Sequence, residues 1–432
     1  MFTRRSFFWS SAAALVASRA PRLAANEAQT SGQLPPSLAA LTSMKDRAKP
    51  ITSDERRARI EKARRLMGEH RIDAIMLTQG TSLVYFTNIH WGGGERLTAC
   101  VVPAKGEPFF VCPAFEEDRA REQIGLGPFG GGKADVRVWN EDESPYALVA
   151  AGLKDRGIAT GVVGVEETTK FVWSDGMAAA APQLKVASGT PITAGCRMIK
   201  TPHELDLMRL ACAATLKVYE AVYRSLAPGM TQNQVSSLIS SAYRRVGFQG
   251  AASVQVGEYT ALPHGSITPQ TIREGTIIMV DDGCSVEGYQ SDITRTFVLG
   301  KATDKMNKVF DIVKRAQSAA LKAAHPGAPL ESIDAAARAV VTEGGYGPGF
   351  KYFSHRLGHG MGMDGHEWPY LVKNNMFGWS KQVNAQPGMV FSDEPGIYIR
   401  GEFGVRLEDD MYITEDGAKL FTPQSESLEK PF

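Results

Sequence analysis

The second half of the chain contains one order of elements twice, and this repeat limits the available folds more than any other feature. Two helix-type stretches separated by a Pro-Gly pair precede two apolar strand-type stretches, and the whole order then recurs. The predicted helices cover 201–226, 231–246, 304–324 and 329–343, with breaks at Pro228-Gly229 and Pro326-Gly327. The predicted strand pairs are 276–283 with 291–300, and 388–396 with 404–414. We therefore predict an internally duplicated domain over 197–432, in which each half ends in a hairpin-like unit.

Two of these helices carry clear start signals. Thr201-Pro202-His203-Glu204 has the spacing of a capping box, with proline at the first helical position. Thr231-Gln232-Asn233-Gln234 has the same spacing at the start of the second helix.

The chain before residue 197 has a different pattern. Apolar runs at 98–104, 108–114 and 160–167 are separated by Gly/Pro turns and by helix-type stretches, the first of them at 54–70. This alternation is typical of α/β structure. A length of 432 residues with 43% apolar content favours two domains. The predicted fold class is therefore α/β (α+β), with a smaller domain over 51–196 before the duplicated one.

The first 50 residues do not fit either domain. Residues 1–25 combine Arg4-Arg5, a short apolar stretch and small residues, which is the pattern of a twin-arginine export signal. A polar linker over 26–50 follows it. We expect an exported, periplasmic protein without stable membrane insertion, because no window is long and apolar enough to span a bilayer.

Charge and cysteine content exclude several other classes. The net charge is +1 and the pI about 7.7, so nothing indicates nucleic acid or an anionic membrane surface as a partner. Five cysteines are widely scattered, which fits neither a disulfide framework nor a thiolate metal site. We expect most of them to be buried, apolar-like residues.

Acidic residues lie on the predicted strands of both repeats. Asp281 and Asp292 are on the first pair, and Glu394 and Glu408 on the second. An Asp before Gly is often only a turn former. Four carboxylates among apolar residues are nevertheless costly to bury unless cations compensate them. The stretch 354–369, SHRLGHGMGMDGHEWP, adds three histidines. Carboxylates with an imidazole suit Mn²⁺, Co²⁺ or Zn²⁺, and bridging carboxylates can hold two such ions.

In order, these motifs resemble those of the M24 metallopeptidases. The match consists of D-x-G, S-D-I-T-R-T-F, G-H-G-x-G-x-x-x-H-E, D-E-P-G-I-Y and V-R-L-E-D-D, and it covers about residues 197–425. Residues 50–195 resemble the N-terminal domain of the prolidase and creatinase branch. The family contains Xaa-Pro dipeptidases (prolidases), Xaa-Pro aminopeptidases and methionine aminopeptidases. The resemblance implies the pseudo-symmetric "pita-bread" fold, a proline-containing peptide as substrate and a homodimer.

Five metal ligands follow from the resemblance, residue by residue. They are Asp281, Asp292, His359, Glu394 and Glu408, with Asp292 and Glu408 bridging two divalent ions. We expect Mn²⁺ first, with Zn²⁺ or Co²⁺ as alternatives. A shift of one residue would exchange Asp281 for Asp282, but the D-x-G spacing favours Asp281.

The resemblance also implies residues that handle protons and substrate. Glu394 would accept the proton of the attacking water, His366 would stabilise the oxyanion, and His264 would place or protonate the proline nitrogen. His355 matches a histidine beside the leaving proline. Arg406 matches an arginine that orients the bridging acids, and Tyr398 a tyrosine near the site.

Dipeptidase and aminopeptidase share this centre. A dipeptidase must bind the carboxylate of the proline, for which Arg356, His355 and Lys373 are candidates. The run HEWP at 366–369 favours the dipeptidase. The other classes that stay open are a hydrolase of another amide, a metal-free creatinase-like hydrolase and a noncatalytic binding module. The last two would lack the acidic ligands, whereas this chain has all of them.

Overall fold

The computed structural model describes residues 34–130, 132–375, 380 and 382–432. The predicted export signal lies outside these residues. The predicted linker is described from residue 34 onward, where it contains the short helix α1 (Pro36–Ala39). Leu38 and Met44 of this segment are buried in the core beside α8 (Pro202–Tyr223). Among the described residues, no helix has both the length and the apolar content needed to cross a bilayer.

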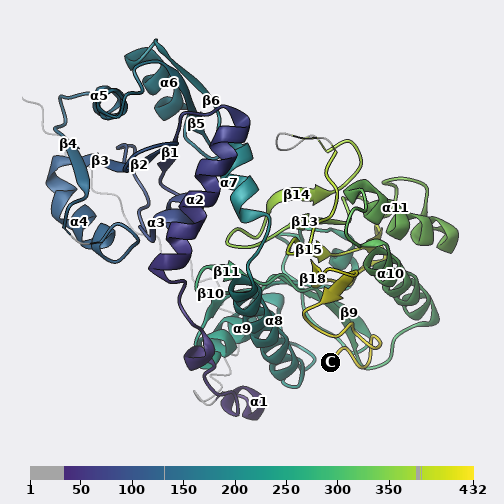
Figure 1. Cartoon of the computed structure of the whole chain (residues 1–432). Coiled ribbons are helices and arrows are strands. Elements are labelled where there is room, and N and C mark those ends of the chain that lie inside the picture. Colours follow the sequence, from purple (N-terminus) through teal and green to yellow (C-terminus); the bar gives the residue numbers. More distant parts are fainter. Residues whose placement is uncertain (1–33, 131, 376–379, 381) are drawn as a thin grey trace, which may run out of the picture. The chain divides into compact units, whose positions relative to one another are not determined.

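The N-terminal domain is a six-stranded mixed sheet with helices on both faces (Figure 1). Its strand order is β4-β3-β2-β1-β5-β6, and the central β1 pairs antiparallel with β2 and parallel with β5. The strands are β1 (Ala74–Thr78), β2 (Ala99–Pro103), β3 (Phe109–Pro113), β4 (Asp135–Trp139), β5 (Gly161–Val165) and β6 (Leu184–Ser188).

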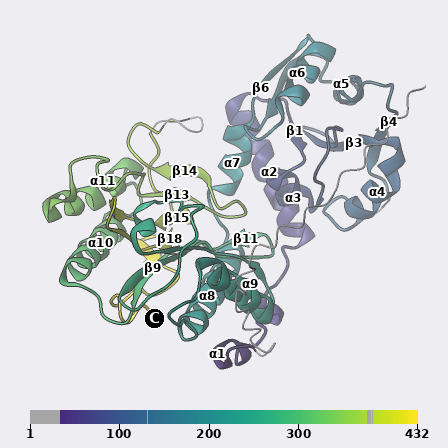
Figure 2. The ribbon, with the colours of Figure 1, turned by 180° about the vertical axis from the view of Figure 1, so that it is seen from behind.

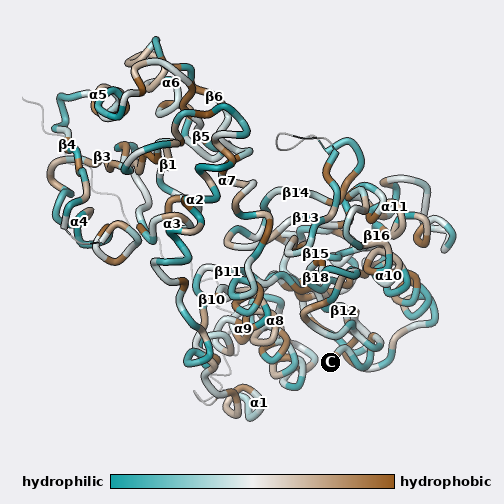
Figure 3. Tube along the Cα trace, viewed as in Figure 1, coloured by the Kyte–Doolittle hydropathy of each residue, from teal (hydrophilic) through white to brown (hydrophobic). Residues whose placement is uncertain are grey.

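The helices of this domain divide according to the alternation of side chains along β1. Ile75 and Leu77 pack with α2 (Ser53–His70), α3 (Thr81–Thr87), α4 (Glu117–Gly125) and α7 (Thr190–Arg197). Ala74 and Met76 point to the opposite face and pack with α5 (Pro145–Asp155) and α6 (Phe171–Ala180). Successive strand residues face opposite sides, so an apolar strand such as β1, brown in Figure 3, needs cover on both.

The C-terminal domain shows the predicted duplication. Its first repeat runs α8, α9 (Gln232–Val246), β8 (Ser253–Val256), β9 (Thr276–Asp281) and β12 (Arg295–Leu299), with β7 (Gln249–Gly250) before β8 and the small hairpin β10–β11 (Cys284–Val286, Tyr289–Gln290) between β9 and β12. The second runs α10 (Asp304–Ala323), α11 (Leu330–Val341), β13 (Gly358–Gly360), β15 (Val390–Asp393) and β18 (Asp409–Ile413), with β14 (Glu367–Leu371) and the hairpin β16–β17 (Gly396–Ile399, Phe403–Arg406) inserted and β19 (Ala418–Leu420) at its end.

The sheets of the two repeats follow the same rule. β9 lies between β8 and β12, and β15 lies between β13 and β18, all antiparallel. In each repeat the two helices pack side by side, α8 with α9 and α10 with α11 (Figure 2). The predicted capping boxes are both present, with Thr201 accepting from the amide of Glu204 and Thr231 from that of Gln234.

Some predicted strands were too long. The strand predicted at 291–300 begins only at Arg295, and the one predicted at 404–414 is divided between β17 and β18. In both cases the missing residues leave the ladder to make long-range contacts. The amide of Asp292 donates to Asp410 Oδ2 at 3.0 Å, and the amide of Glu408 donates to the Thr294 carbonyl at 3.2 Å. The helices predicted to end at 226 and 343 end at Tyr223 and Val341. All five cysteines are free and, as expected, buried.

Candidate active site

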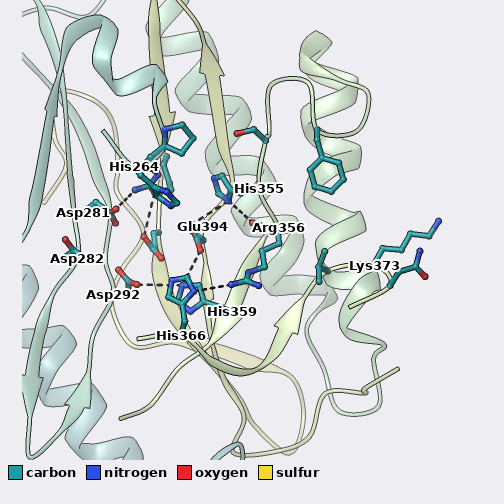
Figure 4. Close-up of a pocket in the computed structure, with 17 residues that line it drawn as sticks. His264, Asp281, Asp282, Asp292, His355, Arg356, His359, His366, Lys373 and Glu394 are labelled. Atoms are coloured by element: carbon teal, nitrogen blue, oxygen red, sulfur yellow. Dashed lines mark hydrogen bonds and ion pairs between the residues drawn. The ribbon is translucent and has the colours of Figure 1, made fainter. Parts of the chain in front are cut away.

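The four acids lie at matching positions of the two repeats. Asp281 ends β9 and Glu394 directly follows β15, while Asp292 and Glu408 precede β12 and β18. The acids of each repeat therefore flank its inserted hairpin. All four line one cavity of about 530 Å³, together with His264, His355, His359 and His366 (Figure 4). The structure thus brings both repeats to one site.

His359 lies in the middle of this group because β13 approaches its neighbours closely. A Cβ atom on Gly358 would lie 2.0 Å from the Ser392 carbonyl oxygen, so only glycine fits there. The His359 side chain is 2% exposed, and its Nε2 lies 3.4 Å from Glu394 Oε1 and 3.7 Å from Asp292 Oδ2. Ligand atoms of Asp292, His359 and Glu408 all lie within 4.8 Å of one another, close enough to share one cation.

Burial and like charge make this arrangement costly without a cation. Burial, as the larger cause, and repulsion from the neighbouring acids, as the smaller one, raise the pKa values of Asp292 and Glu408 well above their usual range. Burial likewise raises the pKa of Glu394 to about 7. Burial and then His366 lower the pKa of His359 to about 3, so its imidazole is neutral and has a lone pair for a ligand. Oxygen-rich donors with one neutral imidazole fit a divalent cation, which would compensate the buried charge.

Arg406 and Thr294 contact the carboxylates of the site through ion pairs and hydrogen bonds. The Arg406 guanidinium is paired with Asp281 and donates to the Tyr398 hydroxyl at 3.0 Å, while its Nε donates to Thr294 Oγ1 at 3.0 Å. Thr294 Oγ1 also lies 2.6 Å from Asp281 Oδ1 and 2.5 Å from Glu408 Oε2. This buried hydroxyl therefore links one acid from each repeat.

Tyr398 connects Arg406 to a histidine at the cavity wall. The Tyr398 hydroxyl lies 2.7 Å from His355 Nε2, and His355 Nδ1 lies 3.9 Å from Glu394 Oε2. Burial, and then the positive Arg406, lower the pKa of His355 to about 3. Tyr398 itself is buried, and its two neighbours His355 and Arg406 line the cavity.

His366 and His264 are more accessible to a ligand. The His366 ring stacks on that of His359, with centroids 3.6 Å apart and planes 15° apart. Arg356 donates to His366 Nδ1 at 3.1 Å, so the neutral ring has its proton on Nε2. His264 is exposed at the cavity wall beside Pro263. Lys373 is exposed at the end of the cavity away from the acids (Figure 4).

The structure separates Asp281 from Asp282. Both oxygens of Asp281 contact Thr294 or Arg406. Asp282 adopts a φ of 114°, and its Oδ2 accepts from the Ser253 amide at 3.1 Å. Asp282 is thus bound to β8, and both acids line the cavity.

Three further acids near the site have other partners or none. Asp409 is paired with Arg295 at 2.6 Å, and Asp410 accepts from the amide of Asp292. Asp393 is fully buried, and neither of its oxygens has a hydrogen-bond partner among the described residues. Burial raises the pKa of Asp393 well above its usual range, which keeps it neutral.

Comparison with known proteins matches both domains of the chain. Residues 206–415 match metallopeptidase family M24, and residues 59–199 match the creatinase/prolidase N-terminal domain. The chain is 36% identical to the probable dipeptidase PepE of Mycobacterium tuberculosis over 80% of its own length and 88% of that protein. The chain belongs to metallopeptidase family M24. The M24 chain is also 32% identical to the Xaa-Pro dipeptidase of Lactobacillus delbrueckii subsp. lactis, over 85% of its length and 98% of that protein.

Solved structures extend the likeness to the whole M24 fold. The dipeptidase PepE from Mycobacterium ulcerans superposes with a TM-score of 0.80 and 32% identity, covering 88% of this chain and 99% of that one. The two domains described above are therefore the creatinase-type N-terminal domain and the pita-bread catalytic domain of the family.

Thr294 is one of the residues around the site that the sequence analysis missed. It is part of the motif S-D-I-T-R-T-F and lies two residues after Asp292. The signal was available, because a hydroxyl so close to a candidate ligand is suited to orient it. Which of its neighbours it contacts depends on the other repeat and could not be seen in the motif.

Proposed function

We propose that this M24 chain is an Xaa-Pro dipeptidase that works with two divalent cations, Mn²⁺ in the first place. The observation that carries the proposal is the distribution of charge along the cavity. Asp281, Asp292 and Glu394 lie at one end, whereas Arg356 and Lys373 lie toward the other (Figure 4). The free carboxylate of a dipeptide would be attracted to the cationic end, while the acids at the other end can hold metal ions.

Asp281, Asp292, His359, Glu394 and Glu408 would hold the cations. Bound divalent ions supply Lewis acidity and lower the pKa of water toward neutrality. Thr294 and Arg406 would keep the carboxylates in place from behind, because they contact acids of both repeats. Glu394, next to His359 and open to the cavity, would accept the proton of the attacking water.

The histidines would act on the peptide itself. Because Arg356 fixes the proton of His366 on Nε2, this ring is ready to donate to the carbonyl oxygen as negative charge develops there. His264, at the same wall as Pro263, would place the proline nitrogen, and His355 would border the proline ring. A proline nitrogen in a peptide bond has no hydrogen, so ring shape and carboxylate binding must replace the usual contact.

The carboxylate of the proline would bind Arg356, with Lys373 beyond it. Arg356 is half-buried at the cavity wall and stacks 4.1 Å from the centre of the Tyr370 ring, which holds its planar fork toward the cavity. A planar guanidinium suits bidentate binding of a carboxylate. This cation supports a dipeptidase over an aminopeptidase, because only the dipeptide has its terminal carboxylate at the proline.

The test is metal analysis of the purified protein beside hydrolysis of Gly-Pro, Ala-Pro and a tripeptide Xaa-Pro-Yaa. We expect two ions per chain and cleavage of the dipeptides, both lost in Glu408→Ala. Glu402→Ala is the matched control, because Glu402 is an exposed acid of the nearby β16–β17 turn that pairs with the exposed Lys305. Cleavage of the tripeptide alone would replace dipeptidase by aminopeptidase P. If the protein binds two ions but cleaves neither the dipeptides nor the tripeptide, the proposed substrate class is wrong.

Export and dimerisation are separate proposals. Arg4-Arg5 and the apolar stretch after them support twin-arginine export to the periplasm. Cell fractionation of the full chain and of Arg4→Lys/Arg5→Lys tests this, and accumulation of the variant inside the cell is the expected result. The expected homodimer is tested by light scattering of the purified protein.

A further inference from the structure

Two acids flank His366, and the same arginine binds both. Asp364 lies two residues before the histidine and Glu367 one residue after it. Arg197 is 2.5 Å from Asp364 Oδ2 and also forms an ion pair with Glu367. The guanidinium thus bridges the chain on both sides of a candidate catalytic residue.

Further contacts and burial hold the two acids and Arg197 in this arrangement. Lys200 lies 2.7 Å from Glu367 Oε1, and the Thr81 hydroxyl donates to Asp364 Oδ1 at 2.5 Å. The side chains of Arg197 and Glu367 are only 10% and 6% exposed. An ion pair as buried as this is strongly destabilising to break, because the remaining charge stays uncompensated.

The loop between β13 and β14 needs such support. Residues 361–366 are outside any strand and include Gly362 and Gly365. Inside the catalytic domain the described backbone bonds of this loop include those from the Gln290 amide to the Gly362 carbonyl, at 2.7 Å, and from the Gly362 amide to the Asp364 carbonyl, at 3.1 Å. A Cβ atom on Gly362 would lie 2.2 Å from Glu367 Oε1, so glycine here leaves room for the acid.

The arginine and the threonine come from the other domain. Arg197 is the last residue of α7 and Thr81 the first of α3, and both lie in the part that matches the creatinase/prolidase N-terminal domain. His366, Asp364 and Glu367 lie in the part that matches the peptidase domain. The contact therefore joins the N-terminal domain to the loop that carries His366.

We infer that Arg197 is a positioning residue for the reaction. By binding Asp364 and Glu367 together, it holds His366 stacked on His359 with its Nε2 toward the substrate carbonyl. The N-terminal domain then supplies part of the catalytic geometry. This inference rests on the proposed function, in which His366 stabilises the oxyanion.

Arg59 offers a matched control. It forms another buried ion pair between the two domains, 2.9 Å from Glu204, with side chains 6% and 2% exposed. Neither Arg59 nor Glu204 contacts the 361–367 loop through a described hydrogen bond or ion pair. Arg59→Lys should therefore weaken the joint between the domains while the ion pairs of Arg197 with Asp364 and Glu367 stay in place.

The experiment compares Arg197→Lys, Asp364→Asn and Arg59→Lys as purified, metal-loaded full chains. Asp364→Asn is the milder variant, since it removes one charge at a half-exposed position and keeps the shape of the side chain. We expect Arg197→Lys to lower kcat on Gly-Pro by up to about 100-fold, the effect of displacing a catalytic group by about 1 Å. Metal content should be unchanged, Asp364→Asn should lower kcat in the same direction, and Arg59→Lys should leave kcat within about twofold of wild type.

A second background separates positioning from general damage. In His366→Asn, the Arg197→Lys change should have little further effect, because residues that act as a unit are not additive. An equal loss of kcat in both backgrounds, or an equal loss in Arg197→Lys and Arg59→Lys, would overturn the inference.

Hydrogen exchange gives a readout that does not need activity. Amides of 361–367 should exchange faster in Arg197→Lys and Asp364→Asn than in wild type, and at the wild-type rate in Arg59→Lys. If wild type cleaves no Xaa-Pro peptide, the proposed function fails, while exchange still decides whether Arg197 orders the loop. Unchanged exchange in Arg197→Lys would refute the ordering itself.

Discussion

Without cations, the protein should lose stability as the carboxyl groups of the site lose their protons. With cations bound, the same deprotonation should favour the folded state. Without a cation, burial raises the pKa of Glu394 from 4.5 to about 7. The folded protein then keeps a proton that the unfolded chain loses above about pH 4.5. Since the folded state binds more protons, the free energy of unfolding falls as the pH rises between those two values. A change from 4.5 to about 7 in one group corresponds to about 3 kcal/mol.

Differential scanning calorimetry of chelated protein between pH 5 and 8 measures this loss. About 3 kcal/mol amounts to a fall in Tm of roughly 6–12 °C for a unit the size of the catalytic domain. Protein loaded with Mn²⁺ should behave differently, because protons compete with the cation for the same carboxylates. The difference in Tm between loaded and chelated protein should therefore widen as the pH rises.

Glu394→Gln isolates the contribution of the one group. Other carboxylates titrate over the same range, so the quantity to compare is the slope of the chelated wild type against that of the chelated variant. The glutamine cannot ionise, and its slope should be flatter by the contribution of Glu394. Identical slopes in the two chelated proteins, or a wild-type Tm that is steady from pH 5 to 7, would refute the reasoning.

Substitutions at three residues around the proposed metal ligands provide further tests. Thr294→Val should weaken Mn²⁺ binding by about 10- to 100-fold in calorimetric titration, whereas Thr294→Ser, which keeps the hydroxyl, should not. Asp282→Asn should keep two ions per chain in metal analysis, and an ion lost there would exchange the roles of Asp281 and Asp282. Arg356→Gln should raise KM for Gly-Pro by up to about 100-fold, the value of one charge-assisted hydrogen bond. The rise should vanish with Gly-Pro amide, and an equal rise with the amide would mean that Arg356 does not bind the carboxylate.

Local signals in the sequence were sufficient for most of the helices. The capping boxes at Thr201 and Thr231 form within one turn, so nothing distant can alter them. The strand ends were not predictable in this way. At Asp292 and at Glu408 the backbone leaves the ladder for partners more than 100 residues away, and the apolar pattern of the sequence continues through both positions.

The residues of the candidate site also fall into those that local motifs predict and those that only long-range contacts reveal. Its acids and histidines lie in short motifs and could be named one by one. Arg197 and Lys200 could not, because they contact Glu367 across 170 and 167 residues of sequence. Asp393, which precedes Glu394, does not align with a ligand position of the motif, and the structure adds that it is buried without a side-chain hydrogen-bond partner among the described residues. Contacts of this kind depend on how the two repeats and the two domains meet.

The way the repeats meet also explains why neither could form the site alone. Duplication gives each half two acids at the ends of an inserted hairpin, but the groups that hold them are exchanged between halves. Arg406 of the second half binds Asp281 of the first, and Thr294 of the first contacts Glu408 of the second. In the same way Asp410 of the second half accepts from the amide of Asp292 in the first. Because carboxylates of both halves contact groups of the opposite half, a cation bound between them would also hold the halves together. Folding of the domain and binding of a cation at this site would therefore be coupled.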